Sequence, residues 1–167
     1  MVTNTDNPHV QAIRQSVTSS YTELNRLIAE RLMRLPTQKL YATLVEGEWT
    51  IMESVAHIIE FMPYWGDEIA KLVALPGQNF GRTKEDEARI RAIEQHKLDS
   101  LETARGALAR SYTYLDEVLG TLKDNDLELK GHHSKFGEQT LAWFIKDFVT
   151  DHLTNHLEQL SRVLEVV

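Results

Sequence analysis

Apolar residues recur every three or four positions in four segments of the chain, and this spacing places them on one face of an α-helix. The four segments cover residues 8–35, 50–74, 83–122 and 140–163. We see no alternation of apolar and polar residues of the kind that a half-buried strand requires. A helix with one apolar face buries it against other helices. The pattern therefore predicts an all-α protein, an up-down four-helix bundle, with residues 1–167 forming a single domain.

Local signals predict where the first two helices begin and end. Asn7 is a suitable N-cap and Pro8 suits the first helical position. Pro36 stops the first helix, because a proline disfavours helical geometry in the residue before it. Thr50 and Glu53 have the spacing of a capping box, which starts the second helix.

The third segment carries leucines at every seventh position, which is typical of a packed bundle seam. They are Leu101, Leu108, Leu115 and Leu122, flanked by Leu98, Tyr112 and Leu119. The charged run at residues 84–94 is expected to form the solvated first turns of this helix. Residues 131–137 are expected to be a loop, after which Thr140 caps the fourth helix.

The composition argues against several classes of protein. The net charge is −7 and no basic stripe is visible, so we expect no nucleic-acid partner. The chain has no cysteine, which excludes disulfides, thiolate nucleophiles and cysteine zinc sites. Residues 1–8 lack the features of a signal peptide, and no stretch is long and apolar enough to span a bilayer. We therefore expect a cytoplasmic enzyme or binding protein without a membrane partner.

Two histidines interrupt the apolar stripe of the fourth segment. His152 and His156 lie between Phe148 and Leu160, one helical turn apart, so their rings can point at the same spot. A buried imidazole needs partners for its nitrogens. The pair could be core histidines bonded to carboxylates or carbonyls, but two on one stripe favour a shared metal ion. A third ligand is then needed, and His57, on a partly apolar face of the second helix, is the best candidate; alone it could be a hydrogen-bonded edge histidine.

Other metal and nucleotide motifs are absent from the sequence. No Glu-x-x-His is present, which a ferritin-like di-iron bundle needs, and the His-Glu-x-x-His of zinc proteases is missing. No Gly-x-Ser-x-Gly elbow, phosphate loop or dinucleotide fingerprint occurs. The remaining candidate is a mononuclear three-histidine site with open positions.

Four polar residues lie within one turn of these histidines. Glu53 and Glu60 are candidates to orient the ring of His57 or to serve as a base, and Asp151 and Gln159 are candidates for the other pair. Each of the four can equally be a solvated or capping residue, and Glu53 in particular is already explained by the capping box with Thr50.

Nearby aromatic residues and loop histidines have two interpretations. Phe61, Tyr64 and Trp65 either line the mouth of a pocket or belong to the core. His132 and His133 either rim the site or lie in a surface loop, and the surface loop is the simpler interpretation.

Two stretches carry a resemblance to a known family. They are WTIMESVAHI at residues 49–58 and HLTNHLEQL at residues 152–160. With these motifs the chain resembles the DinB/YfiT-like metalloenzymes, which have a histidine at the first place and His-x-x-x-His at the second. The resemblance implies a divalent metal ion, zinc or nickel, bound by His57, His152 and His156, with water filling the other positions. It also implies a homodimer, and relatives that include transferases and isomerases dependent on bacillithiol or mycothiol.

These features lead to two hypotheses of function. The first is a metal-dependent enzyme acting on a small molecule, either a hydrolase or an S-transferase that uses a low-molecular-weight thiol, since the chain has no cysteine of its own. The second is a non-catalytic, stress-related bundle that binds a metal or a small molecule. DNA binding is disfavoured by the acidic balance.

Overall fold

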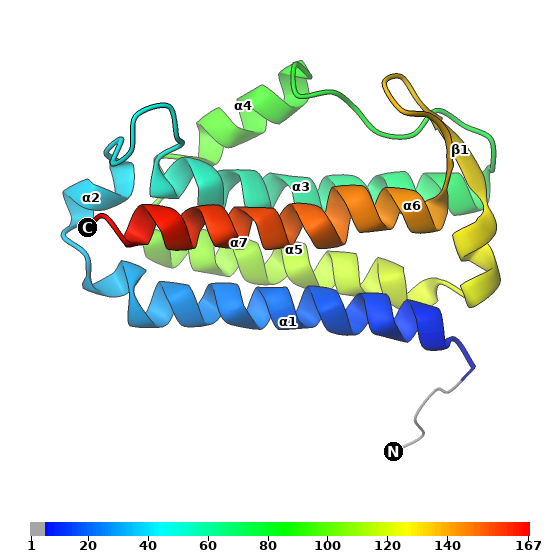
Figure 1. Cartoon of the computed structure of the whole chain (residues 1–167), viewed down its shortest axis with the longest axis horizontal. Helices are drawn as coiled ribbons and strands as arrows, with labels where there is room; N and C mark the ends of the chain where they lie inside the picture. The colour runs from blue at the N-terminus through cyan, green and yellow to red at the C-terminus, as the bar shows by residue number, and fades with distance from the viewer. Residues whose placement is uncertain (1–5) are drawn as a thin grey trace.

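The computed structural model describes residues 6–167. Four rods of helix lie side by side in it, and the predicted all-α four-helix bundle is confirmed (Figure 1). The rods are α1 (Pro8–Glu30), α3 (Ile51–Ala74), α5 (Leu101–Thr121) and a composite of α6 (Leu141–Ile145), the π-helical turn η3 (Lys146–Thr150) and α7 (Asp151–Leu164). In the described part of the chain, no helix combines the length and the apolar character that a membrane crossing needs.

The rods do not alternate in direction throughout. Ile59 of α3 meets Ser111 of α5, and Gly66 lies beside Tyr114, so these two helices run the same way. The first rod and the fourth run opposite to them (Figure 1). Up-down alternation therefore holds from α1 to α3 and from α5 to α7, while residues 75–100 carry the chain back along the bundle between α3 and α5.

The prediction of one long third helix is wrong. The segment 83–122 contains α4 (Glu87–His96) and α5, with a turn between them. Ser100 starts α5 by accepting a hydrogen bond from the Thr103 N–H at 3.1 Å, which is a strong N-cap signal inside the leucine pattern. Leu98 lies in the turn and is 74% exposed, so it is not part of the seam. The charged run belongs to a separate helix that packs across α3.

The ends of α1 also differ from the prediction. The helix stops at Glu30 and is followed by the 3₁₀ turn η1 (Leu32–Arg34) and, after Pro36, by the short helix α2 (Thr37–Tyr41). At the start, Pro8 is in the first turn as predicted. The Asn7 side chain makes no cap, and the Asp124 carboxylate of η2 (Asp124–Glu128) accepts the first free N–H groups of the helix instead.

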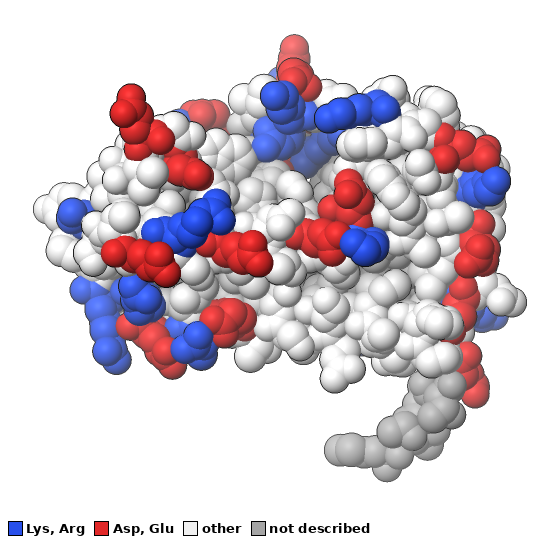
Figure 2. Space-filling model, in the orientation of Figure 1, with Lys and Arg blue, Asp and Glu red and all other residues white. Residues whose placement is uncertain are grey.

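A β-hairpin replaces part of the predicted loop before the fourth rod. Strand β1 (Lys130–His133) pairs antiparallel with β2 (Gly137–Thr140). The other edge of β1 pairs with the returning segment through an isolated bridge between Asn79 and His132. The hairpin and α4 both stand above α3 in Figure 1, and Figure 2 shows basic side chains gathered between them.

The fourth rod is not a regular α-helix. Its π-helical turn η3 contains one more residue than an α-helical turn, and the extra residue rotates the rest of the rod by about 100°. The buried residues after this point are Val149, Leu153, Leu157, Leu160, Val163 and Leu164. His152 and His156 therefore lie beside the buried stripe, on the side that faces α3, and not at its centre as predicted.

A proline in the middle of α3 is accommodated by α5. Pro63 has no N–H, so the carbonyl of Ile59 one turn earlier loses its helical partner. The hydroxyl of Ser111, a buried residue, donates to that carbonyl at 2.8 Å. This contact satisfies a buried backbone group and ties the two parallel helices together.

We expect Ser111→Ala to lower the free energy of unfolding by about 1–3 kcal/mol, because the Ile59 carbonyl is left buried without a donor. In a Pro63→Ala background, position 63 regains an N–H that can bond this carbonyl, so Ser111→Ala should cost clearly less. Urea unfolding of the four proteins completes the double-mutant cycle. Equal costs in both backgrounds would contradict the compensation.

Candidate metal centre

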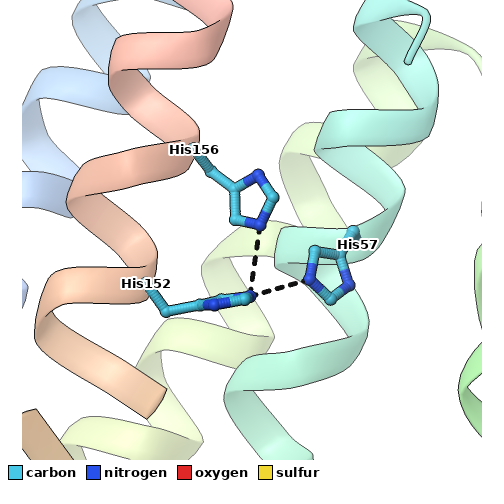
Figure 3. A group of neighbouring side chains, drawn as sticks. All are labelled: His57, His152 and His156. Carbon is cyan, nitrogen blue, oxygen red and sulfur yellow. Dashed lines mark hydrogen bonds between the residues drawn. The ribbon is translucent and has the colours of Figure 1, made fainter. Parts of the chain in front are cut away.

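Three imidazole rings meet between α3 and α7 (Figure 3). His57 comes from α3, and His152 and His156 come from successive turns of α7. The Nε2 atom of His152 lies 2.8 Å from Nε2 of His57 and 3.1 Å from Nε2 of His156. Within residues 6–167, no other group of three His, Asp or Glu side chains brings its donor atoms together in this way. The structure thus brings together the three histidines predicted from the sequence.

Two of the rings are held in one tautomer by partners on their far side. Nδ1 of His57 lies 2.8 Å from the carboxylate Oε1 of Glu60, so this nitrogen carries the proton and donates. Nδ1 of His156 lies 3.2 Å from the amide oxygen of Gln159, and the amide nitrogen of Gln159 donates to Glu48. Both Nε2 atoms are therefore free of hydrogen, and their lone pairs point toward the same spot.

This donor set fits a metal ion. Metal–imidazole bonds of about 2.0–2.1 Å place two ligand nitrogens about 2.9 Å apart at right angles and about 3.3 Å apart in a tetrahedron. The observed separations of 2.8 and 3.1 Å are close to this range. A ligand histidine usually donates its other N–H to a carboxylate or carbonyl, as His57 does to Glu60 and His156 to Gln159.

Burial keeps the rings neutral, which is the form that binds a metal. His57 is 3% exposed, and its pKa is lowered to about 2, first by burial and then by repulsion between its protonated form and the neighbouring basic side chains, among them Arg89 and Arg82. The pKa of His152 is lowered to about 3, again by burial first and then by the neighbouring histidines. Burial also lowers the pKa of His156.

The four polar residues predicted beside the rings separate into two pairs. Glu60 and Gln159 hydrogen-bond the rings. Glu53 is used in the predicted capping box of α3 and does not contact a ring. Asp151 pairs with Lys146 at the surface. The contacts to the rings thus come from the side chains three residues after His57 and His156.

Two residues that were not predicted complete the surroundings of the rings. Trp49 lies edge-on to His57 with ring centroids 5.1 Å apart, and it stacks on His156 at 6.0 Å. Arg82 forms an ion pair with the second oxygen of Glu60. In the sequence Trp49 is the first residue of the stretch 49–58 that carries the resemblance, but only His57 of that stretch was assigned to the site; Arg82 lies between a loop and a charged run and carried no signal of its own.

A pocket of about 500 Å³ opens beside the rings. His57 and His152 form one side of it, and Phe61 and Trp65 line it, as one of the two interpretations of these aromatic residues expected. Tyr64 does not line it; the guanidinium of Arg82 covers its ring at 3.7 Å. The rings are therefore accessible to a small molecule on one side.

The expectation that His133 lies at the surface is wrong. Its side chain is in the wall of the pocket and the residue is only 2% exposed, while His132 is exposed. Nδ1 of His133 accepts the Lys135 N–H at 3.1 Å, so Nε2 carries the proton and donates to the Arg82 carbonyl at 3.3 Å. The ring lies close to Gly81, whose φ of +82° and lack of a Cβ permit the approach. His133 fastens the hairpin to the segment that carries Arg82.

Fold and site together define a four-helix bundle with a histidine-based candidate metal centre. The chain belongs to the DinB superfamily, whose family model matches residues 20–160. Its structure is similar to that of YfiT from Bacillus subtilis, with a TM-score of 0.77, 13% sequence identity, and coverage of 99% of this chain and 91% of YfiT. YfiT is described as a probable metal-dependent hydrolase with an unusual four-helix bundle topology, and at this identity the likeness shows a shared fold. A comparison with curated proteins found no match.

We expect Glu60→Gln to weaken zinc binding by about 10- to 100-fold, because a neutral amide supports the His57 ring and pairs with Arg82 less well than a carboxylate. Competition of the protein with a chromogenic chelator measures this affinity. Glu94→Gln, which alters a surface ion pair with Lys97, is the matched control and should leave it unchanged. Equal zinc affinities in wild type and Glu60→Gln would show that Glu60 does not support the site.

We expect the metal-free protein to lose stability as the pH falls from about 6.5 to about 5. The folded-state pKa values of His57 and His152 lie below the ordinary value of 6.5, so below that pH the unfolded chain binds more protons than the folded one. Each group contributes a slope of up to about 1.4 kcal/mol per pH unit. Urea unfolding in the presence of a chelator measures it.

The matched variants are His152→Gln and His132→Gln. The first removes one of the shifted groups and should flatten the pH dependence, whereas the second changes an exposed histidine and should not. An unchanged slope in His152→Gln contradicts the assignment.

Proposed function

We propose that the chain is a divalent-metal-dependent enzyme acting on a small molecule, with His57, His152 and His156 as ligands of zinc or nickel. The observation that carries this proposal is the convergence of three neutral imidazoles beside a pocket of about 500 Å³. Structural zinc sites complete their coordination with protein ligands, whereas catalytic sites keep a position open. In the part of the chain that the structure describes, no fourth His, Asp or Glu joins the three histidines.

When bound, such an ion supplies Lewis acidity that polarises an electrophile and lowers the pKa of a water or thiol. The chain's own residues prepare the place for it. Glu60 and Gln159 hold the rings of His57 and His156 with Nε2 toward His152, and Trp49 packs on the same two rings and limits their motion. The Glu60 carboxylate is held by Arg82 and by His57, so it serves as a positioning residue and not as a base.

Hydrolysis is the reaction we favour, since it needs no reactant beyond water and the structurally similar YfiT is described as a probable metal-dependent hydrolase. Thiol transfer is the second form of the same proposal. The chain has no cysteine, so the thiol would be a low-molecular-weight co-substrate. The pocket volume lies within the usual range for small-molecule sites, about 300–1,000 Å³.

We expect the purified protein to hold about one zinc or nickel ion per chain, and His152→Ala and His156→Ala to lose most of it, because two remaining imidazoles bind weakly. Elemental analysis after dialysis measures the metal content. His132→Ala, which removes an exposed histidine of the hairpin, should keep the wild-type content. Unchanged metal in both α7 variants would refute the site.

Activity assays separate the reactions. A panel of small esters and amides, assayed with and without a low-molecular-weight thiol, should show turnover that a chelator removes and added metal restores. Turnover only with the thiol identifies a transferase. Full metal occupancy without turnover, either with or without the thiol, would instead support the hypothesis of a non-catalytic metal-binding bundle.

A further inference from the structure

The guanidinium of Arg89 lies in the pocket wall without a carboxylate partner. Its neighbours Arg82 and Arg91 form ion pairs with Glu60 and Glu87, but Arg89 has none among residues 6–167. Its one side-chain hydrogen bond, from Nη1 to the carbonyl of Lys84 at 3.0 Å, uses one of five N–H donors. A guanidinium with free N–H donors in the wall of a pocket is a candidate to bind an anion through charge-assisted hydrogen bonds.

Arg89 lies close to the candidate metal ligands. Its guanidinium carbon is 5.6 Å from the ring centre of Trp49, and the same ring contacts His57 and His156. The charge of Arg89 lowers the pKa of all three ligand histidines, and burial lowers the pKa of Arg89 itself. Arg89 also lines the same pocket as His57 and His152, so its guanidinium lies in a partly desolvated position within the space that a ligand of the rings would enter.

The pocket as a whole is basic, although the chain carries a net charge of −7. Arg82, Lys84, Arg89 and Lys135 line it, against the carboxylates of Glu85 and Asp147. Basic side chains gather between α4 and the hairpin in Figure 2. Three neutral imidazoles bring no negative charge to a divalent ion, so a loaded site would add further positive charge. These charges favour an anionic guest.

An aromatic wall faces this basic edge. Phe136 of the hairpin turn is 38% exposed and lies 5.8 Å from Phe148, which in turn stacks on Trp65 at 4.6 Å. The wall offers an apolar surface to the part of a ligand that does not carry the charge. Lys135 lies over the Phe136 ring at 5.1 Å, where it adds a second cation to the same edge.

We propose that the pocket binds a small organic anion, whose carboxylate or phosphonate-type group pairs with Arg89 and whose apolar part lies against Phe136 and Phe148. The inference rests on the proposed function, because the anion is taken as the substrate class of the metal centre. Arg89 then sets the position of the substrate beside the three histidines, and neutral analogues are poor ligands.

The experiment titrates phenylacetate, phenylphosphonate and the neutral phenylacetamide into zinc-loaded protein and into chelator-treated protein, followed by calorimetry. Both anions should bind more tightly than the amide, and Arg89→Gln should weaken them by about 10- to 100-fold, as expected for a charge-assisted hydrogen bond, with no effect on the amide. Arg91→Gln makes the same change at an exposed arginine two residues further along α4, and it should leave the affinity for the anions unchanged. Arg89→Lys keeps the charge without the planar fork and should retain part of the affinity.

Phe136→Ala should weaken the binding of the anions and of the amide to the same extent, because it removes apolar surface and no charge. Anions that bind no better than the amide, or that bind Arg89→Gln as tightly as wild type, overturn the proposal. The metal content of the same samples is measured in parallel. Anion binding that depends on Arg89 in a protein that takes up no metal supports the anion pocket and refutes the metal enzyme, whereas full metal occupancy without such binding refutes only the anion pocket.

Discussion

The site depends on the interactions of the Glu60 carboxylate. One oxygen accepts the Nδ1–H of His57, and the other pairs with Arg82. Burial raises the pKa of Glu60, and the Arg82 guanidinium opposes that shift. Since an unpaired buried carboxylate costs several kcal/mol, these three side chains are stable only together. One buried charge thus fixes the tautomer of a candidate ligand in α3 and holds the returning segment of the chain against the same helix.

The direction of the rods explains why the pocket exists. Because α3 and α5 run the same way, residues 75–100 must travel back along the bundle, and they do so over α3. That path places Arg82 and Arg89 beside His57, and the hairpin fastens to it through His133. A bundle with only short loops would have no such outer layer, and the three rings would open directly to solvent. The walls of the pocket are therefore a product of the long connection.

The parts of the structure that depend on local chemistry could be predicted from the sequence. The capping box that starts α3 and the one-turn spacing of His152 and His156 are properties of neighbouring residues, and both are present. The hairpin was missed because its strands have four residues each and one edge pairs with a loop. Leu98 fitted a heptad that the cap at Ser100 interrupts. Arg89 was missed because a charged run is exposed unless the tertiary structure covers it, and no local pattern shows that.

The π-helical turn determines what the two α7 histidines can do. In a regular helix, the phase set by Leu141 and Ile145 would carry His152 and His156 into the centre of the core, where each ring would need its own buried partner. The extra residue of η3 gives that place to Leu153 and Leu157 and turns the rings toward α3. There both rings meet His57, and His152 lines the pocket beside it. Single π-helical turns occur often at functional sites. Here the turn lets one rod supply both a packed apolar stripe and two imidazoles that face α3, which a strict 3.6-residue period could not do with this sequence.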